Sequence, residues 1–247
     1  MKLTLIDPAY LKDSIAVISE LVNEARFKIT KNSIELVAMD PANVAMVVFK
    51  LLASCFSEYT LEKDTEICID LNNLKQILRR VKPSDQLTLS LEEDNMLHII
   101  LASSSTRTFS VPIIEMDKRE QRVPQLDLPV SIKMLCNTLN DAIEDVGIVA
   151  ESVAFTAHPD KLVIRAEGDL SKANVDIPAS KDTIITTSHE RLRARYSIEY
   201  LKKMMNGSKL AETVEISFNQ DYPLRLDYKV VDRVLLAFIL APRVEDD

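Results

Sequence analysis

The sequence contains no tryptophan, and aromatic residues make up only 5% of its 247 positions. This scarcity argues against a protein that binds nucleic acid by stacking bases on aromatic rings. Only three glycines occur, so the glycine-rich loop that binds phosphates in nucleotide-binding proteins is absent. No apolar run approaches the length of a membrane span, and the first residues lack a signal-peptide hydrophobic region. We therefore expect an intracellular protein with no membrane partner.

Residues that bind metals or react covalently are also sparse. The cysteines Cys55, Cys68 and Cys136 form no CxxC pair and lie in apolar stretches, which predicts buried free thiols. The three histidines are too far apart for metal-ligand spacing, and no two carboxylates form a recognisable acid/base pair. We therefore expect no metal and no cofactor, and no motif identifies catalytic residues or specifies a reaction.

The two halves of the chain resemble each other. Residues 71–91 align without a gap with residues 198–218, at an offset of 127. In both copies the apolar residues first recur three and four positions apart and then alternate, which predicts a helix followed by a strand. The apolar stripe that begins at Leu11 recurs 128 residues later at Leu139. The sequence therefore predicts two copies of one domain.

Each copy contains helical and strand patterns in the same order. Two helices and several strands in each half predict an α+β fold, with the helices packed on one face of antiparallel sheets. The expected helices span residues 8–22, 70–82, 131–146 and 197–209. The expected strands lie within residues 27–39, 66–71, 86–91, 96–103 and 107–113, and then within 153–167, 173–178, 214–218 and 224–230.

A proline-containing segment separates the two copies. Pro112, Pro124 and Pro129 lie near the middle of the chain, around a charged run over residues 117–122. Proline removes backbone donors and favours extended geometry, so we expect an exposed, semi-stiff connector. The expected domains are therefore residues 1–113 and 131–247, joined by an interdomain connecting loop over residues 114–130.

The net charge of −8 argues against a nucleic-acid partner only if the charge is evenly spread. The four expected helices hold nine basic and seven acidic residues, a sum of +2, which leaves −10 for the rest of the chain. Basic positions recur at equivalent places in both halves, which leaves two interpretations open, phosphate contacts that do not read the bases and an ordinary solvated surface. These residues are Lys12, Lys75, Arg79, Arg80, Lys82, Lys133, Lys202, Lys203 and Lys209.

The duplicated domain, the stretch AMDPANVAMV at residues 38–47, the central connector and the ending LAPRVEDD at residues 240–247 resemble a DNA sliding clamp. The closest resemblance is to the proliferating cell nuclear antigen family in its archaeal form. The resemblance implies a trimeric ring around duplex DNA, bound without regard to sequence, with helices lining the hole. It implies a non-catalytic processivity factor of the cytoplasm or nucleoid. Its expected partners in DNA replication and DNA repair are DNA polymerase, the clamp loader, flap endonuclease and DNA ligase.

The resemblance also implies a groove in which partner enzymes insert a short peptide with hydrophobic and aromatic anchors. An apolar groove that contains methionine adapts to varied partners. For each of these positions plain core packing is the competing interpretation, and it is the favoured one for Met39 and Val44 taken alone. The matching residues are Met39, Val44, Met46, Val123, Pro124, Leu126, Pro223, Ile239, Ala241 and Pro242.

Ring closure requires two complementary edges on each subunit. The resemblance implies that a late strand of the first half, at residues 106–111, pairs with residues 172–177 of the next subunit. Alternation places one side-chain face of each strand at this subunit interface. The residues on these faces are Arg107, Phe109 and Val111, and Ala173, Val175 and Ile177.

One helix departs from the pattern, because residues 131–146 carry Asp141, Glu144 and Asp145 where sliding clamps are usually more basic. This difference leaves open whether the trimeric ring contains three copies of this chain or includes paralogues. A checkpoint or repair-type clamp subunit of the same fold is the alternative function. A hydrolase with scattered Asp, His and Ser residues and a purely structural oligomer are the remaining alternatives.

Overall fold

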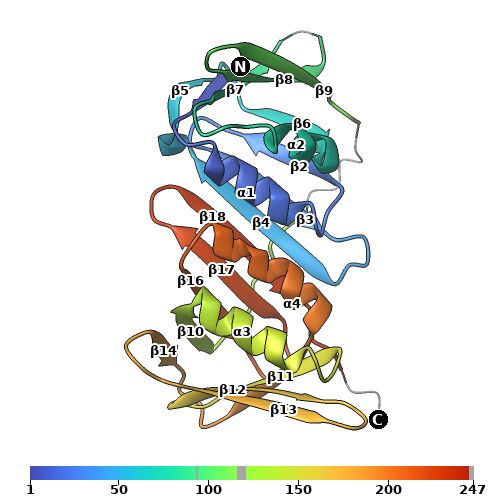
Figure 1. The fold of residues 1–247 in the computed structure, drawn as a ribbon, viewed down its shortest axis with the longest axis vertical. Helices are drawn as coiled ribbons and strands as arrows, with labels where there is room; N and C mark the ends of the chain where they lie inside the picture. Colours follow the sequence, from blue (N-terminus) through green and yellow to red (C-terminus); the bar gives the residue numbers. More distant parts are fainter. Residues whose placement is uncertain (93, 116–120, 245–247) are drawn as a thin grey trace. The chain divides into compact units, whose positions relative to one another are not determined.

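The computed structural model of the chain describes residues 1–92, 94–115 and 121–244. The chain divides into two compact units (Figure 1). Unit 1 comprises Met1–Pro41, Val47–Val123 and Val230–Leu236. Unit 2 comprises Ala42–Met46, Pro124–Lys229 and Ala237–Asp247.

Unit 1 contains the helices α1 (Ala9–Ile18) and α2 (Leu71–Leu78), which lie side by side (Figure 1). One set of strands runs in the order β5-β1-β7-β8-β9. These strands are β1 (Lys2–Leu5), β5 (Phe56–Thr60), β7 (Gln86–Leu91), β8 (Met96–Ala102) and β9 (Thr106–Pro112). A second set runs in the order β4-β3-β2-β6. These strands are β2 (Glu24–Ile29), β3 (Ser33–Met39), β4 (Ala45–Leu52) and β6 (Thr65–Asp70), with a 3-10 turn at Ala53–Cys55.

Unit 2 contains the helices α3 (Cys136–Val146) and α4 (Ile198–Met205), which also lie side by side (Figure 1). One set of strands runs in the order β14-β10-β16-β17-β18. These are β10 (Val130–Leu135), β14 (Thr183–Thr186), β16 (Thr213–Phe218), β17 (Leu224–Val230) and β18 (Val234–Leu240). The other set runs in the order β13-β12-β11-β15. These are β11 (Ser152–Ala157), β12 (Lys161–Glu167), β13 (Lys172–Pro178) and β15 (Leu192–Ser197), and a 3-10 turn at Asn206–Lys209 follows α4.

The two units repeat one topology. Helix α2 begins at Leu71 and α4 at Ile198, and 198 − 71 is 127; strand β8 begins at Met96 and β17 at Leu224, and 224 − 96 is 128. Each strand of the first unit has a counterpart at one of these two offsets, and the counterparts stand in the same order within their sheets. The expected α+β fold of two similar domains, each with two helices on antiparallel strands, is confirmed.

Amphipathic helices pack on the sheets of each unit. The stripe Leu71, Leu74 and Leu78 of α2 is buried, and in α4 the residues Ile198 and Leu201 are buried at the equivalent positions. Because these apolar side chains recur every three or four residues, one face of each helix contacts the sheets and the opposite face is left to charged residues. Asp70 caps α2, and its side chain accepts a hydrogen bond of 2.8 Å from the backbone N–H of Asn73.

The structure corrects one expected element type. Residues 130–135 form strand β10 and not the beginning of a helix that starts at residue 131. Within β10 the side chains of Val130, Ile132 and Met134 are buried and alternate with more exposed ones, the period of a strand. The expected helix therefore begins five residues too early, and α3 starts at Cys136.

Several strands were not expected from the sequence. Strands β1, β5 and β14 are only four or five residues long, which leaves little periodic signal. Strand β4 reads as a nearly continuous apolar run rather than an alternating one. Residues 114–115 and 121–129 of the expected connector contain neither helix nor strand, and residues 116–120 lie outside the described part of the chain. None of the described helices is long and apolar enough to cross a membrane.

The three cysteines are buried and free, as the sequence predicted. Burial raises the pKa of the Cys136 thiol to about 11. A thiol with this pKa remains protonated at neutral pH and is a poor nucleophile or metal ligand. The structure therefore assigns this cysteine to the core of unit 2.

Candidate nucleic-acid interface and docking surfaces

The basic residues of unit 1 extend along α2 and the turn that follows it. Arg79, Arg80 and Lys82 are exposed, whereas the side chain of Lys75 is only 15% exposed. The Nζ atom of Lys75 lies 2.5 Å from Oε1 of Glu20, at the end of α1. Among the described residues no carboxylate pairs with Arg79 or Lys82, so these two side chains retain an uncompensated positive charge.

The equivalent basic residues of unit 2 are more strongly paired. Lys202 lies 2.7 Å from Glu144 of α3, and Lys203 lies 2.8 Å from Glu199 one turn away. The hydrogen bond from Lys203 lowers the pKa of Glu199 below its ordinary value. Lys209 is exposed, and no ion pair joins it to a carboxylate in the part of unit 2 that the structure describes. Among the basic residues expected on the helices of unit 2, Lys209 is therefore the one whose charge is not compensated by a described carboxylate.

Two other expected contacts differ in their placement. Lys12 lies on α1 and is half-buried. Lys133 lies on strand β10 and not on a helix, with its side chain on the face opposite Ile132 and Met134. It is the register partner of Glu215 on β16, and its charge contributes to lowering the pKa of Glu215, after the hydrogen bond from Ser131. Lys133 therefore belongs to a sheet surface rather than to the basic helices.

The two expected interface strands are edge strands. Strand β9 ends the order β5-β1-β7-β8-β9, and β13 begins the order β13-β12-β11-β15. Their side chains have the same burial pattern, in which only Val111 on β9 and Ile177 on β13 are buried. Phe109 and Val175 occupy the matching half-buried positions two residues earlier. Each of these strands thus pairs with one neighbour, leaves its other edge open among the described residues, and carries apolar side chains on one face.

A groove accompanies the edge strand of unit 1. It has a volume of about 380 Å³ and lies between α2 and β9. Ile77 and Phe109 supply half-buried apolar surface, and Arg80 lines one side. The groove is lined by Asn73, Gln76, Ile77, Arg80, Phe109, Ser110, Val111 and Pro112.

A buried carboxylate connects β9 with the turn that follows α2. Asp85 forms an ion pair with Arg107 of β9, and its Oδ2 atom accepts a hydrogen bond of 2.7 Å from the backbone N–H of Lys82. These contacts hold the pKa of Asp85 below its ordinary value, the Lys82 N–H being the larger cause. The sequence singled out Arg107 but not Asp85, because nothing in the local spacing indicates that the two meet.

Helix α3 carries the opposite charge and contacts strand β13. Its residues Asp141, Glu144 and Asp145 are all exposed. Glu144 pairs with Lys202 of α4, so part of this acidic surface reduces the positive charge of its own unit. The edge strand β9 therefore lies beside a basic helix and β13 beside an acidic one.

The residues expected to form a peptide groove are distributed over both units. In unit 2 the backbone N–H of Ala241 donates a hydrogen bond of 2.9 Å to the carbonyl of Val44, so two of the expected segments are adjacent. Met46 and Ile239 are 5% and 6% exposed and belong to the core. Pro124, Leu126, Pro223, Ala241 and Pro242 of unit 2 are exposed or half-buried, as are Met39 and Val123 of unit 1.

Among the described residues no group of three or more His, Cys, Asp or Glu side chains is placed to hold a metal ion.

A duplicated α+β unit with paired helices, basic residues at repeated helical positions and an open strand at the edge of each unit defines a ring-forming clamp. Models of the N-terminal and C-terminal domains of proliferating cell nuclear antigen match residues 1–121 and 122–243. The chain belongs to this family of DNA polymerase sliding clamps, which are processivity factors without catalytic activity.

Individual relatives agree with this assignment. The DNA polymerase sliding clamp of Nanoarchaeum equitans is 33% identical over 98% of this chain and 99% of its own length. That of Pyrococcus furiosus is 33% identical over 92% of both chains. The crystal structure of proliferating cell nuclear antigen from Thermococcus kodakaraensis matches 98% of this chain and 99% of its own, with a TM-score of 0.92 and 27% identity. Membership of the family implies DNA and DNA polymerase as partners.

Proposed function

We propose that this chain forms a ring around duplex DNA and that the exposed side chains of its helices contact the phosphates without reading the sequence. The observation that carries this proposal is the recurrence of basic residues at the 127-residue offset, as at Lys75 and Lys202 and at Lys82 and Lys209. A repeated unit presents the same surface at each repetition, so a ring of such units surrounds its centre with positive charge. Weak phosphate contacts of this kind permit sliding.

The basic residues differ in how much they contribute to DNA contact. Arg79, Lys82 and Lys209 are exposed and supply the main contacts. Lys75, Lys202 and Lys203 each hold an ion pair, which reduces their attraction to phosphate until the partner carboxylate is displaced. The three remaining residues of the set follow their placement: Lys12 contributes from α1, Arg80 lines the groove beside β9, and Lys133 is left out because it lies on a sheet.

The subunit contact follows from the two edge strands. Strand β9 ends one strand order of unit 1 and β13 ends one strand order of unit 2, and the two strands have the same burial pattern. If β13 of one subunit pairs with β9 of its neighbour, each subunit joins two others head to tail. This arrangement supports a head-to-tail ring through Phe109 and Val111 on one side and Ala173, Val175 and Ile177 on the other.

Charge complementarity supports the same contact. Arg80 lies beside β9 in the groove next to α2, and the acidic residues of α3 lie on a helix that contacts β13. A subunit that adds its β13 to the exposed β9 edge brings its α3 toward the groove between α2 and β9. The acidic helix, which is unusual for a DNA-facing surface, is then explained as the partner of Arg80. Electrostatic complementarity of this kind fixes the register of an interface more than it adds to affinity.

The partners of the ring include DNA polymerase, and we extend them to the clamp loader, flap endonuclease and DNA ligase. The proposed binding site for their peptides contains the half-buried and exposed residues of the expected groove, with Val123 as the most exposed large apolar side chain. The described residues 121–129 of the connecting loop are part of this proposed site, and the domain bounds 1–113 and 131–247, with the loop over residues 114–130, stay predictions. Such partners require an intracellular location.

The subunits of the ring are copies of this chain or of paralogues. A related crystal structure is a complex of two different clamp proteins, PCNA2 and PCNA3 of Sulfolobus tokodaii, with a TM-score of 0.89 and 25% identity over 99% of this chain and all of its own. Light scattering of the purified chain separates the two cases. A stable trimer indicates a homotrimer, and a monomer or dimer that forms rings only with related chains indicates a heterotrimer.

A topological experiment tests the proposed function. The protein, with its loader and any paralogue that completes the ring, is loaded onto nicked circular DNA and separated from free protein by gel filtration at moderate salt. We expect retention on the circle and release when one restriction cut makes the DNA linear. Loss from circular and linear DNA at the same rate would contradict encirclement and indicate ordinary surface binding.

A further inference from the structure

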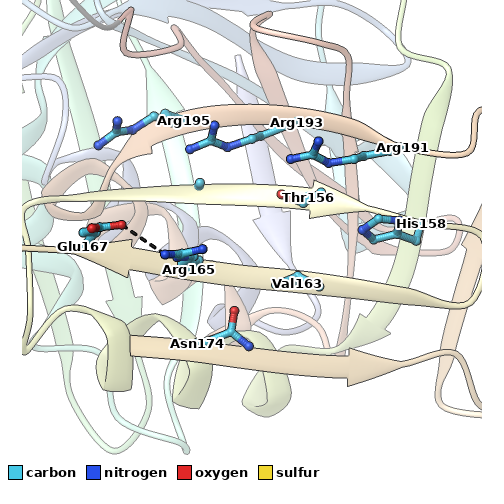
Figure 2. A pocket seen from close by; sticks show the side chains of 10 residues that line it. Thr156, His158, Val163, Arg165, Glu167, Asn174, Arg191, Arg193 and Arg195 are labelled. Atoms are coloured by element: carbon cyan, nitrogen blue, oxygen red, sulfur yellow. Dashed lines mark hydrogen bonds and ion pairs between the residues drawn. The ribbon is translucent and has the colours of Figure 1, made fainter. Parts of the chain in front are cut away.

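Three arginines lie on one face of β15, which is the edge strand opposite β13 in the same strand order of unit 2. Arg191, Arg193 and Arg195 alternate along β15 and the residue before it, and Figure 2 shows their side chains in a row. The residues between them, Leu192 and Ala194, are buried on the opposite face. These arginines do not belong to the basic helices and have no role in the clamp function described above.

The neighbouring strands turn this row into a trough. In the sheet register Ala154 of β11 lies between Arg195 of β15 and Arg165 of β12, and Thr156 lies beside Arg193. Because the central strand carries short side chains and its neighbours carry long ones, the surface is hollowed over a volume of about 520 Å³. Arg191, Arg193, Arg195, Arg165 and His158 surround the hollow, with Asn174 and Glu167 at its far side (Figure 2).

The charge of the trough is only partly compensated. Arg165 forms an ion pair with Glu167 at 3.1 Å, and Arg195 donates a hydrogen bond of 3.0 Å to the hydroxyl of Ser152. Among the described residues no carboxylate pairs with the guanidinium of Arg191 or Arg193. Four arginines therefore face one hollow that contains a single described carboxylate, in a protein whose net charge is −8.

The geometry indicates the kind of anion that fits. A guanidinium binds a carboxylate through two parallel hydrogen bonds, and alternate residues of a strand are roughly 7 Å apart, the same repeat as alternate side chains of an extended peptide. The volume is within the range of roughly 300–1,000 Å³ of sites that hold small ligands, and is too small for a duplex. No aromatic residue except His158 lines the trough, so base stacking finds no support.

We propose that this arginine trough, formed by Arg191, Arg193, Arg195 and Arg165, docks an extended acidic peptide segment of a partner protein. Carboxylates at alternate positions of the segment pair with Arg191 and Arg193, and the short side chains of Ala154 and Thr156 leave room for its backbone. The trough lies entirely within unit 2, so the proposal goes beyond the clamp function and does not depend on ring closure.

Fluorescence anisotropy tests the trough with a labelled peptide of about nine residues that carries Asp at alternate positions. A matched peptide with Asn in place of Asp is the neutral probe, and a labelled single-stranded oligonucleotide of similar charge is the nucleic-acid probe. The intact protein is compared with R191Q/R193Q and with K181Q/K229Q, a control that removes two positive charges elsewhere in the same unit. Thermal unfolding verifies that both variants fold.

We expect the Asp peptide to bind the intact protein and K181Q/K229Q alike, and the R191Q/R193Q variant to bind it at least about tenfold more weakly. Binding of the Asn peptide should be undetectable, and affinity for the Asp peptide should fall as salt rises. Thr156→Glu provides a second variant, because it puts a carboxylate in the trough while all four arginines remain. It should weaken binding to a similar extent.

Three results would overturn the proposal. The first is absence of binding to the intact protein, and the second is an equal loss in both double variants, which would mean that only net charge matters. The third is tighter binding of the oligonucleotide that also depends on Arg191 and Arg193, which would make the trough a nucleic-acid site.

Discussion

Arg107 on the edge strand β9 forms an ion pair with Asp85, whose side chain is completely buried. The Nη1 atom of Arg107 also donates a hydrogen bond of 3.2 Å to the carbonyl of Arg80. One side chain therefore connects the edge strand with both the end of α2 and the turn that follows. This connection keeps the strand and the groove beside it in a fixed relation before any other subunit is bound.

The first prediction concerns the pH dependence of this connection. The pKa of Asp85 is lower in the folded protein than its ordinary value of about 3.9, so the carboxylate stabilises the folded state above that pH. The stabilisation is lost as the pH falls through the lower, folded-state pKa. Asp85→Asn should reduce the thermal unfolding temperature at pH 7 and reduce it less at strongly acidic pH. Asp64→Asn, at an exposed position, is the control and should change little at either pH.

Equal destabilisation by Asp85→Asn at pH 7 and at pH 2–3 would contradict this prediction, since those values span the range in which a depressed carboxylate titrates. It would mean that the lost hydrogen-bond geometry, and not the charge, accounts for the effect.

The second prediction concerns DNA contact. Replacing Arg79, Lys82 and Lys209 by Ala should weaken retention on DNA. Each phosphate contact releases counterions when the protein binds DNA. Loss of one contact should therefore make the slope of log K against log salt shallower by roughly 0.9. The control replaces Lys28, Lys31 and Lys181, three exposed lysines away from the helices. Salt titrations of DNA binding by the complete ring measure the slope for the triple variant and for the control. An unchanged slope in the variant of Arg79, Lys82 and Lys209 would mean that the DNA-facing surface lies elsewhere.

The third prediction separates partner binding from folding. Val123 is 39% exposed, so Val123→Asp should abolish binding of a partner peptide while the unfolding temperature stays within a few degrees. Met46 is 5% exposed, and Met46→Asp should instead destabilise the fold by several kcal/mol, because it buries an unpaired carboxylate. Calorimetric titration with the peptide and thermal unfolding distinguish the two outcomes. Unchanged peptide affinity in Val123→Asp would exclude Val123 from the groove.

The fourth prediction concerns the direction of assembly. Phe109→Asp damages the β9 edge and leaves β13 intact, whereas Val175→Asp does the reverse. If the chain forms a homotrimer, each variant alone should be monomeric by light scattering. An equimolar mixture should form dimers but no trimers, because only one intact β9 and one intact β13 meet. Trimers that survive in either variant would show that the contact lies outside these two strands.

If the chain forms rings only with paralogues, the same variants are mixed with those paralogues. Each variant should then lose one of the two neighbours and keep the other. Loss of both neighbours through a single variant would indicate misfolding, which thermal unfolding detects independently.

The sequence by itself determined the duplicated α+β architecture, because amphipathic helices and alternating strands leave a periodic signal that repeats at one offset. The offset of 127 that aligns residues 71–91 with 198–218 is the same offset that relates α2 to α4 and β7 to β16. The edge position of β9 and β13 was implied by the resemblance to sliding clamps, because alternation assigns side-chain faces but does not distinguish an edge strand from a central one. Short strands such as β1 and β14 were missed, since four residues cannot establish a period.

Only the tertiary structure decided which charges remain available and which are paired within the chain. Lys202 and Glu144 are 58 residues apart, and Arg107 and Asp85 are 22 apart, so neither pair has a local spacing that a sequence pattern can reveal. Neither strand β15 nor its arginine row was expected from the sequence, and the hollow beside the row depends on Ala154 and Thr156, which the sheet register brings next to it. Helical and strand periodicity are properties of neighbouring residues, whereas the charge of a surface depends on residues that folding brings together from distant parts of the chain.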